Sequence, residues 1–479
     1  MMRKLIGYST IGTNDKNRAK KFYNSLLRAI DAQSFSDPSD DRITFWMRDD
    51  GKEFVLATAI PYNGEEATSG NGSMTGISLD SQEQVKEMYD KAIELGASDE
   101  GEPGMRGGTF YGAYVRDLDG NKYIDYALSQ GAITLGHRNP KVTKAIREQL
   151  NKGTSFSLPT ELEIDVSKML IKMIPSAEKV RFGKNGNDAT TAAVRLARYY
   201  TDKKHILFCG YHAWQDWYIG QTSMNGGVPD EVSKLSHRFV YNEIDTVNRL
   251  LKDLKNDVAC IIIDPLPGQE STPNIKFLKE LRKITEEKNI VLIFDEVVTG
   301  FRYIKGSVQS FTGITPDLST FAKGLSNGMP LSAIVGKRKL MDKFPKIFFS
   351  LTYAGETLSL AAAKAVLTIY KNFDVPNFFE TQGKKLKDGL SKLINDFDLQ
   401  ERMSVYGANC RFGVNFNKKN IVKYDSTEDM KHWITLSSRH GILNSGMHLL
   451  SLAHNDDIIS ETLKKYKRLM PELRKILLN

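Results

Sequence analysis

The alternation of apolar and polar positions along the chain changes its character near residue 117. Before that point, short alternating segments at residues 43–47, 53–58 and 109–116 predict strands with one buried face. After it the apolar runs are unbroken, at residues 206–209, 239–242, 259–263 and 291–294, and such runs are typical of strands buried on both faces of a mainly parallel α/β sheet. The pattern therefore predicts that the parts of the chain before and after residue 117 fold into units of different structural class.

The first unit contains a weak internal repeat at an offset of 66 residues. In each copy a strand-like run, at residues 6–11 or 74–79, leads through a polar pair, Asn14-Asp15 or Asp80-Ser81, into an amphipathic helical pattern. The polar pairs are suitable helix N-caps, and the apolar spacing places one face of each helix on a sheet. This part of the chain is therefore expected to form two βαβ-type halves.

Two strings in this first unit carry a family resemblance. One is Tyr-Ser-Thr-Ile-Gly-Thr-Asn-Asp followed by Ala-Lys-Lys-Phe-Tyr at residues 8–23, and the other is Gly-Ala-Tyr-Val-Arg-Asp-Leu-Asp-Gly-Asn-Lys at residues 112–122. The unit resembles the vicinal oxygen chelate, or glyoxalase-like, superfamily, which implies a βαβββ-repeat domain over residues 1–112. Members usually hold a divalent metal with histidine and carboxylate ligands. Because no histidine precedes His137, we expect no metal site here and a packing or ligand-binding role.

The remainder of the chain is expected to contain two further domains. Strands followed by helices at intervals of a few tens of residues predict a large α/β domain with a parallel sheet over residues 113–375. The last hundred residues are helical in pattern and rich in lysine, with a few strand-like runs such as residues 411–415. They predict a smaller α+β lobe over residues 376–479.

The strongest chemical signal is an aspartate and a lysine 28 positions apart. Asp295 ends the apolar run of Ile-Val-Leu-Ile-Phe-Asp-Glu-Val-Val-Thr-Gly-Phe-Arg, and Lys323 lies in the Gly-flanked string Phe-Ala-Lys-Gly-Leu-Ser-Asn-Gly. A pyridoxal phosphate (PLP) site needs an acid that keeps the pyridine nitrogen protonated and a lysine that forms a Schiff base. Taken alone, Asp295 could be only a helix cap and Lys323 a solvated lysine.

A phosphate cradle and a stacking ring are the other requirements of such a site. Gly186 and Asn187 lie in a Gly-containing turn that runs directly into an Ala-rich helix, whose positive end and free N–H groups suit a phosphate. Tyr211 follows the apolar run at residues 206–209 and could stack on a cofactor ring. The alternatives are an ordinary capped helix for the turn and a core position for Tyr211.

Several strings together make the second part of the chain similar to another family. They are Asp-Leu-Asp-Gly-Asn-Lys-Tyr-Ile-Asp-Tyr at 117–126, Leu-Gly-His-Arg-Asn-Pro at 135–140, Ser-Leu-Pro-Thr-Glu-Leu-Glu at 157–163, the phosphate turn, Gly-Tyr-His at 210–212, the Asp295 and Lys323 blocks, and Thr-Tyr-Ala-Gly-Glu-Thr-Leu-Ser at 352–359. From about residue 113 the chain resembles a class III aminotransferase of PLP fold type I, and within it the glutamate-1-semialdehyde aminomutase branch.

The resemblance implies a role for each matching residue. Lys323 becomes the Schiff-base lysine and Asp295 the partner of the pyridine nitrogen. Thr352 falls where the family supplies a phosphate ligand from the neighbouring subunit, which implies a homodimer with shared active sites. The other cofactor-binding positions are Gly186 and Asn187 at the phosphate, Tyr211 and Val297 on the two ring faces, Gln269 near the ring hydroxyl, and His212 beside Tyr211.

Three functions remain open at this stage. The first is an aminotransferase that moves an amino group from a small-molecule donor to a carbonyl acceptor. The string Gly-Glu-Thr-Leu-Ser at 355–359 resembles family members that act on sugars or sugar acids, which implies an acceptor of that kind. The second is an aminomutase, although the branch commonly carries a glutamate in the stretch that reads Asn-Ser-Gly-Met-His-Leu-Leu at 444–450. The third is a glyoxalase-like binding or resistance module on a transaminase scaffold.

Composition and charge exclude several other classes. Hydrophobic residues make up 41% and charged residues 26% of 479, as in ordinary globular proteins. The net charge of +8 comes from basic residues interleaved with acids, so we expect no nucleic-acid partner. Apolar runs are far too short to span a bilayer, the first residues lack a secretory pattern, and the three cysteines form no CxxC motif, so we expect no membrane partner and a cytoplasmic location.

Overall fold

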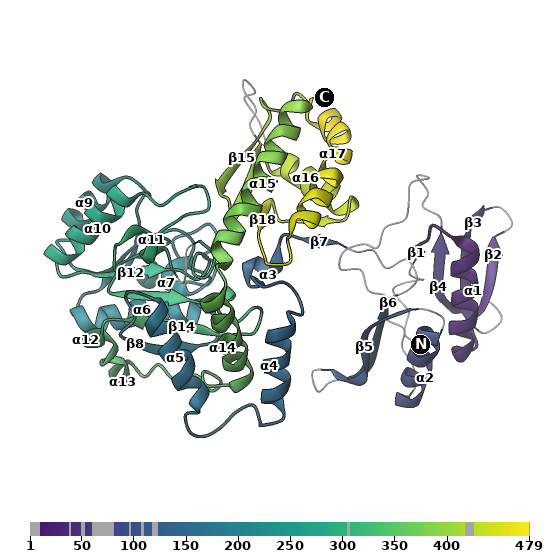
Figure 1. Ribbon diagram of the computed structural model, residues 1–479, viewed down its shortest axis with the longest axis horizontal. Coiled ribbons are helices and arrows are strands. Elements are labelled where there is room, and N and C mark those ends of the chain that lie inside the picture. The colour runs from purple at the N-terminus through teal and green to yellow at the C-terminus, as the bar shows by residue number, and fades with distance from the viewer. Residues whose placement is uncertain are drawn as a thin grey trace. The chain divides into compact units, whose positions relative to one another are not determined.

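The computed structural model describes residues 10–37, 40–48, 53–59, 81–94, 97–106, 110–116, 123–303, 307–416 and 426–478. Contacts within the chain divide it into two compact units, Met1–Tyr123 and Ile124–Asn479, whose elements are labelled in Figure 1. The sequence-based boundary between residues 112 and 113 lies inside strand β6 (Phe110–Arg116) of the first unit. Within the described ranges, no helix is long and apolar enough to cross a membrane.

The first unit begins with a four-stranded sheet covered by one helix. Its elements are β1 (Thr10–Gly12), α1 (Lys16–Leu26), a 3₁₀ turn (Leu27–Ile30), β2 (Gln33–Asp37), β3 (Asp40–Arg48) and β4 (Glu53–Ala59). The strand order is β1-β4-β3-β2, with β1 parallel to β4 and the other pairs antiparallel. As the sequence predicts, Asp15 caps α1, and Phe22 and Leu26 of α1 are buried with Trp46 of β3.

The second copy of the repeat is described from its helix onward. Helix α2 (Gln82–Glu94) is followed by β5 (Ser98–Arg106), which pairs antiparallel with β6. The predicted capping residue Ser81 accepts a hydrogen bond from the N–H of Gln84. The predicted strand at residues 74–79 lies outside the described residues. The observed order in this copy is therefore α2-β5-β6.

A seven-stranded sheet forms the centre of the second unit. Its strands are β8 (Lys179–Gly183), β9 (His205–Cys209), β10 (Ser236–Arg238), β11 (Val258–Ile263), β12 (Val291–Asp295), β13 (Leu318–Phe321) and β14 (Ser332–Gly336), in the order β10-β9-β11-β12-β13-β14-β8. Strands β11 and β12 are buried at every position. The unbroken apolar runs at 259–263 and 291–294 are thus central strands, as predicted.

Two details of this sheet differ from the sequence-based expectation. The sheet is mainly parallel, as expected, but it is mixed, because β14 runs antiparallel to both β13 and β8. The connection at residues 322–331 is shorter than the dozen or more residues that a parallel crossover needs. The predicted strand at 239–242 is also wrong: only the N–H of Phe239 continues the ladder, and Asn242 has a left-handed backbone (φ 67°) that turns the chain toward helix α9 (Ile244–Asp253).

Helices cover both faces of the sheet (Figure 1). Helix α6 (Gly186–Thr201), α12 (Arg338–Met341) and α13 (Phe344–Ile347) bury apolar side chains on one face, with α7 (Asp216–Ile219) beside them. Helices α9 and α10 (Ile275–Glu287) bury theirs on the other face. The remaining elements before the last lobe are α3 (Leu128–Gly131), α4 (Pro140–Leu150), α5 (Glu161–Met173), α8 (Asp230–Ser233), α11 (Val308–Thr312), the 3₁₀ turn Lys323–Leu325 and α14 (Thr357–Asn372).

The last lobe is a small α+β structure, as the sequence predicts. It contains α15 (Val375–Asp396), β15 (Met403–Ala408), β16 (Arg411–Phe416), α16 (Ser426–Arg439), β17 (Ile442–Leu443), β18 (Met447–Leu449) and α17 (Asp456–Leu478). Strands β15, β16 and β18 form an antiparallel sheet. Strand β17 pairs in parallel with β7 (Ile124–Asp125), so the first strand of the second unit is tied to its last lobe.

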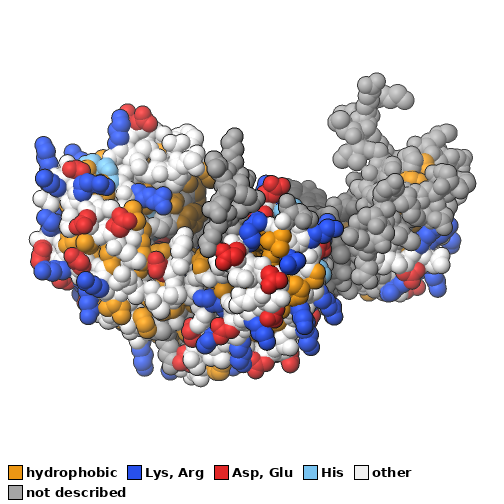
Figure 2. Space-filling model, turned by 90° about the horizontal axis from the view of Figure 1, so that it is seen from above, with side chains coloured by type: hydrophobic (Ala, Val, Ile, Leu, Met, Phe, Trp, Pro, Cys, Tyr) orange, Lys and Arg blue, Asp and Glu red, His pale blue; other side chains and the backbone are white. Residues whose placement is uncertain are grey.

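Charged side chains are intermixed on the surface of the second unit. On the face drawn in Figure 2, Lys and Arg side chains are interspersed with Asp and Glu. Pairs such as Lys283 with Glu287 and Lys384 with Asp388 lie one helical turn apart on exposed faces. This arrangement agrees with a solvated surface in which basic and acidic residues are interleaved.

Candidate active site

Asp295 occupies a buried position at the carboxyl end of β12. Its side chain is only 6% exposed. Oδ1 accepts hydrogen bonds from the N–H of Val297 (3.1 Å) and from Oγ1 of Thr320 (3.1 Å), while Oδ2 lies 2.7 Å from Nδ1 of His212. Both carboxylate oxygens are therefore fixed by the fold.

His212 follows β9 and connects Asp295 to that strand, from which β12 is separated by β11. It is fully buried, its ring stacks on Trp217 with centroids 5.9 Å apart, and its Nε2 lies 3.1 Å from the carbonyl oxygen of Cys209. A carbonyl oxygen can only accept, so Nε2 carries a proton. The other ring nitrogen, Nδ1, faces Oδ2 of Asp295, so the imidazole connects this carboxylate to the main chain at the end of β9.

Lys323 lies in the turn that follows β13, the strand next to β12. Its backbone is left-handed (φ 45°), an uncommon conformation for a residue with a side chain, and such positions often occur at functional sites. Burial lowers the pKa of Lys323, which Asp295 partly opposes and Arg302 reinforces. A lysine whose pKa is lowered is more readily available as the neutral amine that attacks a carbonyl.

The turn at the start of α6 has the features of an anion site. Asn185 caps the helix, and Oδ2 of Asp188 accepts hydrogen bonds from the main-chain N–H of Lys184 (3.1 Å) and Asn185 (2.8 Å). Gly186 and Asn187 are the first two helical residues, whose N–H groups have no acceptor within the helix. These two N–H groups lie at the positive end of the helix, where a phosphate binds favourably.

Gly186 also brings this turn against Val297. A Cβ atom at Gly186 would lie 2.8 Å from Cγ1 of Val297, a separation that side chains do not adopt. Because Val297 follows Asp295 by two residues, the close approach joins the phosphate turn to the Asp295 segment. The predicted residues Gly186, Val297, Asp295, His212 and Lys323 therefore come from neighbouring elements at one edge of the sheet.

The other predicted residues lie at the surface. Tyr211 is 70% exposed and touches the edge of Tyr218, with ring centroids 5.7 Å apart. Gln269 and Thr352 are both exposed. Neither of these two side chains has a hydrogen bond to another residue in the described ranges. The chain thus leaves Tyr211, Gln269 and Thr352 accessible to a ligand or a partner.

Sequence reasoning missed several polar residues of this site. Thr320 holds Asp295 from the adjacent strand, and no pattern in the sequence marks it. Asp264 follows β11, and burial raises its pKa to about 6, although the Arg411 guanidinium opposes this shift. Arg411 donates from Nη2 to the carbonyl oxygen of Leu266 (2.5 Å) and lies 3.8 Å from Asp264. The signal for Asp264 was its position directly after an apolar strand.

Comparison with known proteins decides the family. A family model described as Aminotransferase class-III matches residues 109–468. The chain belongs to the class-III aminotransferase family. Two relatives named glutamate-1-semialdehyde 2,1-aminomutase, from Methanocaldococcus jannaschii and Persephonella marina, are each 36% identical to it. The alignments cover 73% and 74% of this chain and 88% of each relative.

Solved structures show the same fold at lower identity. The Sphingopyxis sp. MTA144 FumI protein, solved in a form with PLP, has a TM-score of 0.70 at 24% identity over 83% of this chain and 97% of that one. A glutamate-1-semialdehyde aminomutase from Pseudomonas aeruginosa PAO1 has a TM-score of 0.64 at 21% identity over 75% and 86%. Class-III aminotransferases use PLP, and the expected PLP enzyme of fold type I is thereby confirmed.

The buried aspartate, the low-pKa lysine and the free helix N–H groups fit PLP. The pyridine nitrogen needs an acidic partner, the aldehyde an amine, and the phosphate a set of N–H donors. The chain has one group of each kind: Asp295 is the acid, Lys323 is the amine, and Gly186 and Asn187 provide the N–H donors. The family match begins at residue 109, so the first unit lies almost entirely outside it.

Proposed function

We propose that the chain is an aminotransferase in which Lys323 binds PLP and moves the proton at the substrate carbon that carries the amino group. The observation that supports this best is the fixing of Asp295 by His212, Thr320 and Val297, one strand away from Lys323. When bound, PLP supplies a ring that accepts electrons from the substrate. Asp295 keeps a proton at the ring nitrogen, and His212 stabilises the charge of Asp295.

The remaining cofactor contacts follow the same arrangement. The N–H groups of Gly186 and Asn187 hold the phosphate at the start of α6. Tyr211 covers one ring face and Val297 the other, while Gln269 binds the ring hydroxyl. The exposure of Tyr211 is compatible with this role, because it leaves the ring accessible to a bound cofactor.

The active protein is proposed to be a homodimer with shared sites, in which Thr352 reaches the phosphate bound by the partner. Large apolar side chains beside Thr352 are exposed, namely Phe348 (84%) and Tyr353 (61%). Leu158 (78% exposed) belongs to a loop that the hydrogen bond from Thr357 N–H to the carbonyl oxygen of Thr154 holds beside this segment. Exposed apolar side chains clustered in this way are typical of a protein interface.

The acceptor is proposed to be a carbonyl compound such as a sugar or sugar acid. The relatives named as glutamate-1-semialdehyde aminomutases favour the second candidate, an aminomutase that moves nitrogen between neighbouring carbons. The two differ in their need for a second substrate. Glutamate-1-semialdehyde supplied alone should be converted by an aminomutase, whereas an aminotransferase needs both a donor and an acceptor for repeated turnover.

The first unit is proposed to be a glyoxalase-like appendage without a catalytic metal, with the domains divided as 1–112, 113–375 and 376–479. The order β1-α1-β2-β3-β4, with β1 parallel to β4, is a βαβββ module, and α2-β5-β6 supports a second one. The rival function is a binding module on a transaminase scaffold. A scaffold would not need Lys323 together with Asp295, so these residues favour the enzyme. Elemental analysis of the purified protein tests whether this unit binds a metal. Zinc, nickel or iron bound to it in a stoichiometric amount would contradict the proposal.

A screen of amino donors tests the proposed function. Each donor is added to the protein saturated with PLP, and the visible absorbance of the cofactor attached to Lys323 is followed. An accepted donor should convert the cofactor to its amine form, with loss of that absorbance and release of the keto product. Failure of every amino donor, with PLP attached to Lys323, would favour the scaffold.

A further inference from the structure

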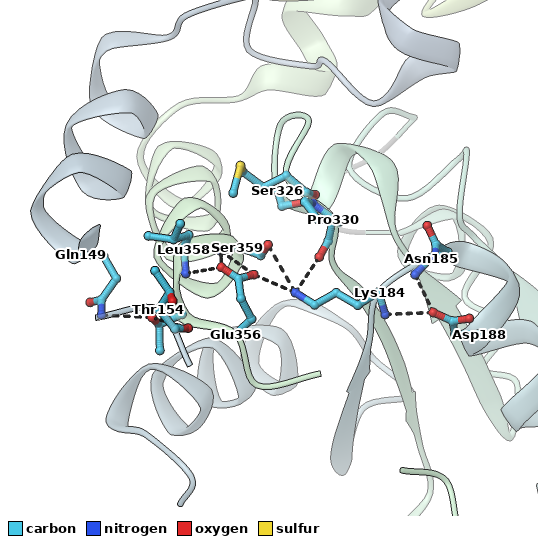
Figure 3. A network of polar contacts seen from close by, with 12 residues as sticks. Gln149, Thr154, Lys184, Asn185, Asp188, Ser326, Pro330, Glu356, Leu358 and Ser359 are labelled. Carbon is cyan, nitrogen blue, oxygen red and sulfur yellow. Dashed lines mark hydrogen bonds and ion pairs between the residues drawn. The ribbon is translucent and has the colours of Figure 1, made fainter. Parts of the chain in front are cut away.

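Lys184 makes an unusually complete set of contacts in the turn between β8 and α6. Its Nζ lies 2.7 Å from Oε2 of Glu356, 3.0 Å from the carbonyl oxygen of Pro330 and 3.4 Å from Oγ of Ser359 (Figure 3). An ammonium group has three N–H donors. All three donors of Lys184 therefore have an acceptor within the protein, and its side chain is only 15% exposed.

These acceptors come from segments that lie far apart in the sequence. Pro330 ends the turn that begins at Lys323, and Ser326 and Met329 close that turn with a hydrogen bond. Glu356 and Ser359 belong to the start of α14, directly after the Thr352 segment. The main-chain N–H of Lys184 itself is held by Asp188 in the phosphate turn. One lysine thus connects the phosphate turn, the Lys323 turn and the start of α14.

Glu356 is a fixed, ionised partner. Its Oε1 caps α14 by accepting hydrogen bonds from the N–H of Leu358 (2.7 Å) and Ser359 (3.2 Å). Burial by itself would raise the pKa of Glu356, but hydrogen bonds from Lys184 and Ser359 hold the pKa below its ordinary value. Both members of the pair are largely shielded from water, and removing one member of such a pair leaves the other charge uncompensated.

The start of α14 is anchored from a third side. Gln149 of α4 donates from Nε2 to Oγ1 of Thr357 (3.1 Å), and Thr357 donates to the carbonyl oxygen of Gly153 (2.8 Å). Glu356 is therefore attached to a segment that α4 holds in place (Figure 3). A displacement of Lys184 would move the phosphate turn relative to this fixed point.

We propose that Lys184, through its ion pair with Glu356, is a positioning residue of the cofactor site. It sets the distance between the N–H groups that hold the phosphate and the turn that carries Lys323, so PLP can reach both at once. The inference rests on the proposed function. A role limited to fold stability would connect the same segments without affecting PLP affinity, and this difference makes the proposal testable.

The test compares two quantities for the apoprotein of each variant. The dissociation constant of PLP is measured by absorbance titration, and the melting temperature is measured separately. Lys184→Met and Glu356→Gln should each weaken PLP binding about tenfold or more, and the double variant should lose less than the product of the two losses. Lys337→Met is the matched control, because Lys337 forms a partly buried pair with Asp317 at the start of β13, the opposite end of that strand from Lys323. This control should lower the melting temperature without changing PLP affinity.

The outcomes separate this inference from the proposed function. Wild-type protein that takes up no PLP would overturn both. Normal PLP binding by the wild type, with Lys184→Met within twofold of it, would overturn this inference alone, whatever happens to the melting temperature. If Lys184→Met does not fold, Lys184→Arg retains the charge but changes the geometry of the donors, and it should bind PLP more weakly than the wild type. Unchanged affinity in Lys184→Arg would then contradict the proposal.

Discussion

Nδ1 of His212 lies 2.7 Å from Oδ2 of Asp295, and the opposite ring nitrogen of His212 is held by the carbonyl oxygen of Cys209. The imidazole is thus fixed between two acceptors in a buried site. A carboxylate held in this way can keep its negative charge without contact with water, because the neighbouring N–H and O–H donors replace the lost solvation. Such a carboxylate is suited to holding a proton at the nitrogen of a bound pyridine ring.

Replacing Asp295 by asparagine should leave PLP attached to Lys323 but slow turnover roughly a hundredfold or more, because an amide cannot keep the ring nitrogen protonated. The amide retains the size of the side chain and can still accept from Thr320. Single-turnover kinetics with an accepted donor would measure the effect. Wild-type rates in Asp295→Asn would mean that this residue only caps the strand.

Gly186→Ala should weaken PLP binding about tenfold, because the added Cβ would lie 2.8 Å from Cγ1 of Val297 and push the phosphate turn away. The same substitution in a Val297→Ala background should cost much less, since the obstructing methyl group is gone. Titration of the four proteins with PLP gives the coupling between the two positions. Equal losses in both backgrounds would show that the close approach does not govern the turn.

Acid should destabilise the last lobe through two buried histidines. Burial lowers the pKa of His448 to about 3 and that of His454 to about 4, from an ordinary value of 6.5. Below pH 6.5 the unfolded chain binds protons that the folded protein does not. The contribution of each histidine to the free energy of unfolding therefore falls with decreasing pH until the folded pKa is reached, by up to ~1.4 kcal/mol per pH unit.

Comparison with a variant isolates this histidine effect. The raised pKa values of Asp264 (about 6) and Glu296 (about 7) act in the opposite direction, because these carboxyls keep their protons in the folded state while the unfolded state loses them. These contributions are common to the wild type and to His448→Phe. Between pH 4 and 6, urea unfolding should give a slope of the free energy of unfolding against pH that is lower in the variant than in the wild type by up to ~1.4 kcal/mol per pH unit. An identical slope in the two proteins would contradict the assignment.

Mixed dimers test the shared site. Lys323→Ala and Thr352→Val, each poorly active alone, should recover about a quarter of the wild-type activity after exchange of subunits, since half of the dimers are hybrid and each hybrid has one intact site. Co-purification through two different tags confirms that hybrids formed. Verified hybrids without recovered activity, or a fully active monomer, would contradict the proposed dimer.

The sequence was informative where local chemistry and strand pattern coincide. Asp295 ends an apolar strand and Lys323 lies in a Gly-flanked turn, and both are at the carboxyl edge of the sheet, where parallel strands place their functional residues. The residues that fix them were not foreseeable in the same way. Thr320 contacts Asp295 only because β12 and β13 are paired, and Lys184 meets Glu356 across 172 positions of sequence.

The errors in the predicted fold have local physical causes. Apolar residues at 239–242 suggested a strand, but the strand lies at Ser236–Arg238, the ladder ends with the N–H of Phe239, and the left-handed backbone at Asn242 then turns the chain. The direction of β14 follows from the short connection at residues 322–331, which contains Lys323 and cannot form a parallel crossover. The pattern of apolar residues does not show this. Pairing of Ile124 with Ile442 joins the two ends of the second unit, and no local signal marks such a pair.

The attachment point of PLP tests the central claim most directly. The protein is saturated with PLP, reduced with borohydride, digested and examined by peptide mass spectrometry. The account predicts a stable label on Lys323 at one per chain, and none on the Lys323→Ala variant treated in the same way. A label on another lysine, such as Lys184 in the adjacent turn, or the absence of any label on protein that retains its fold, would contradict it.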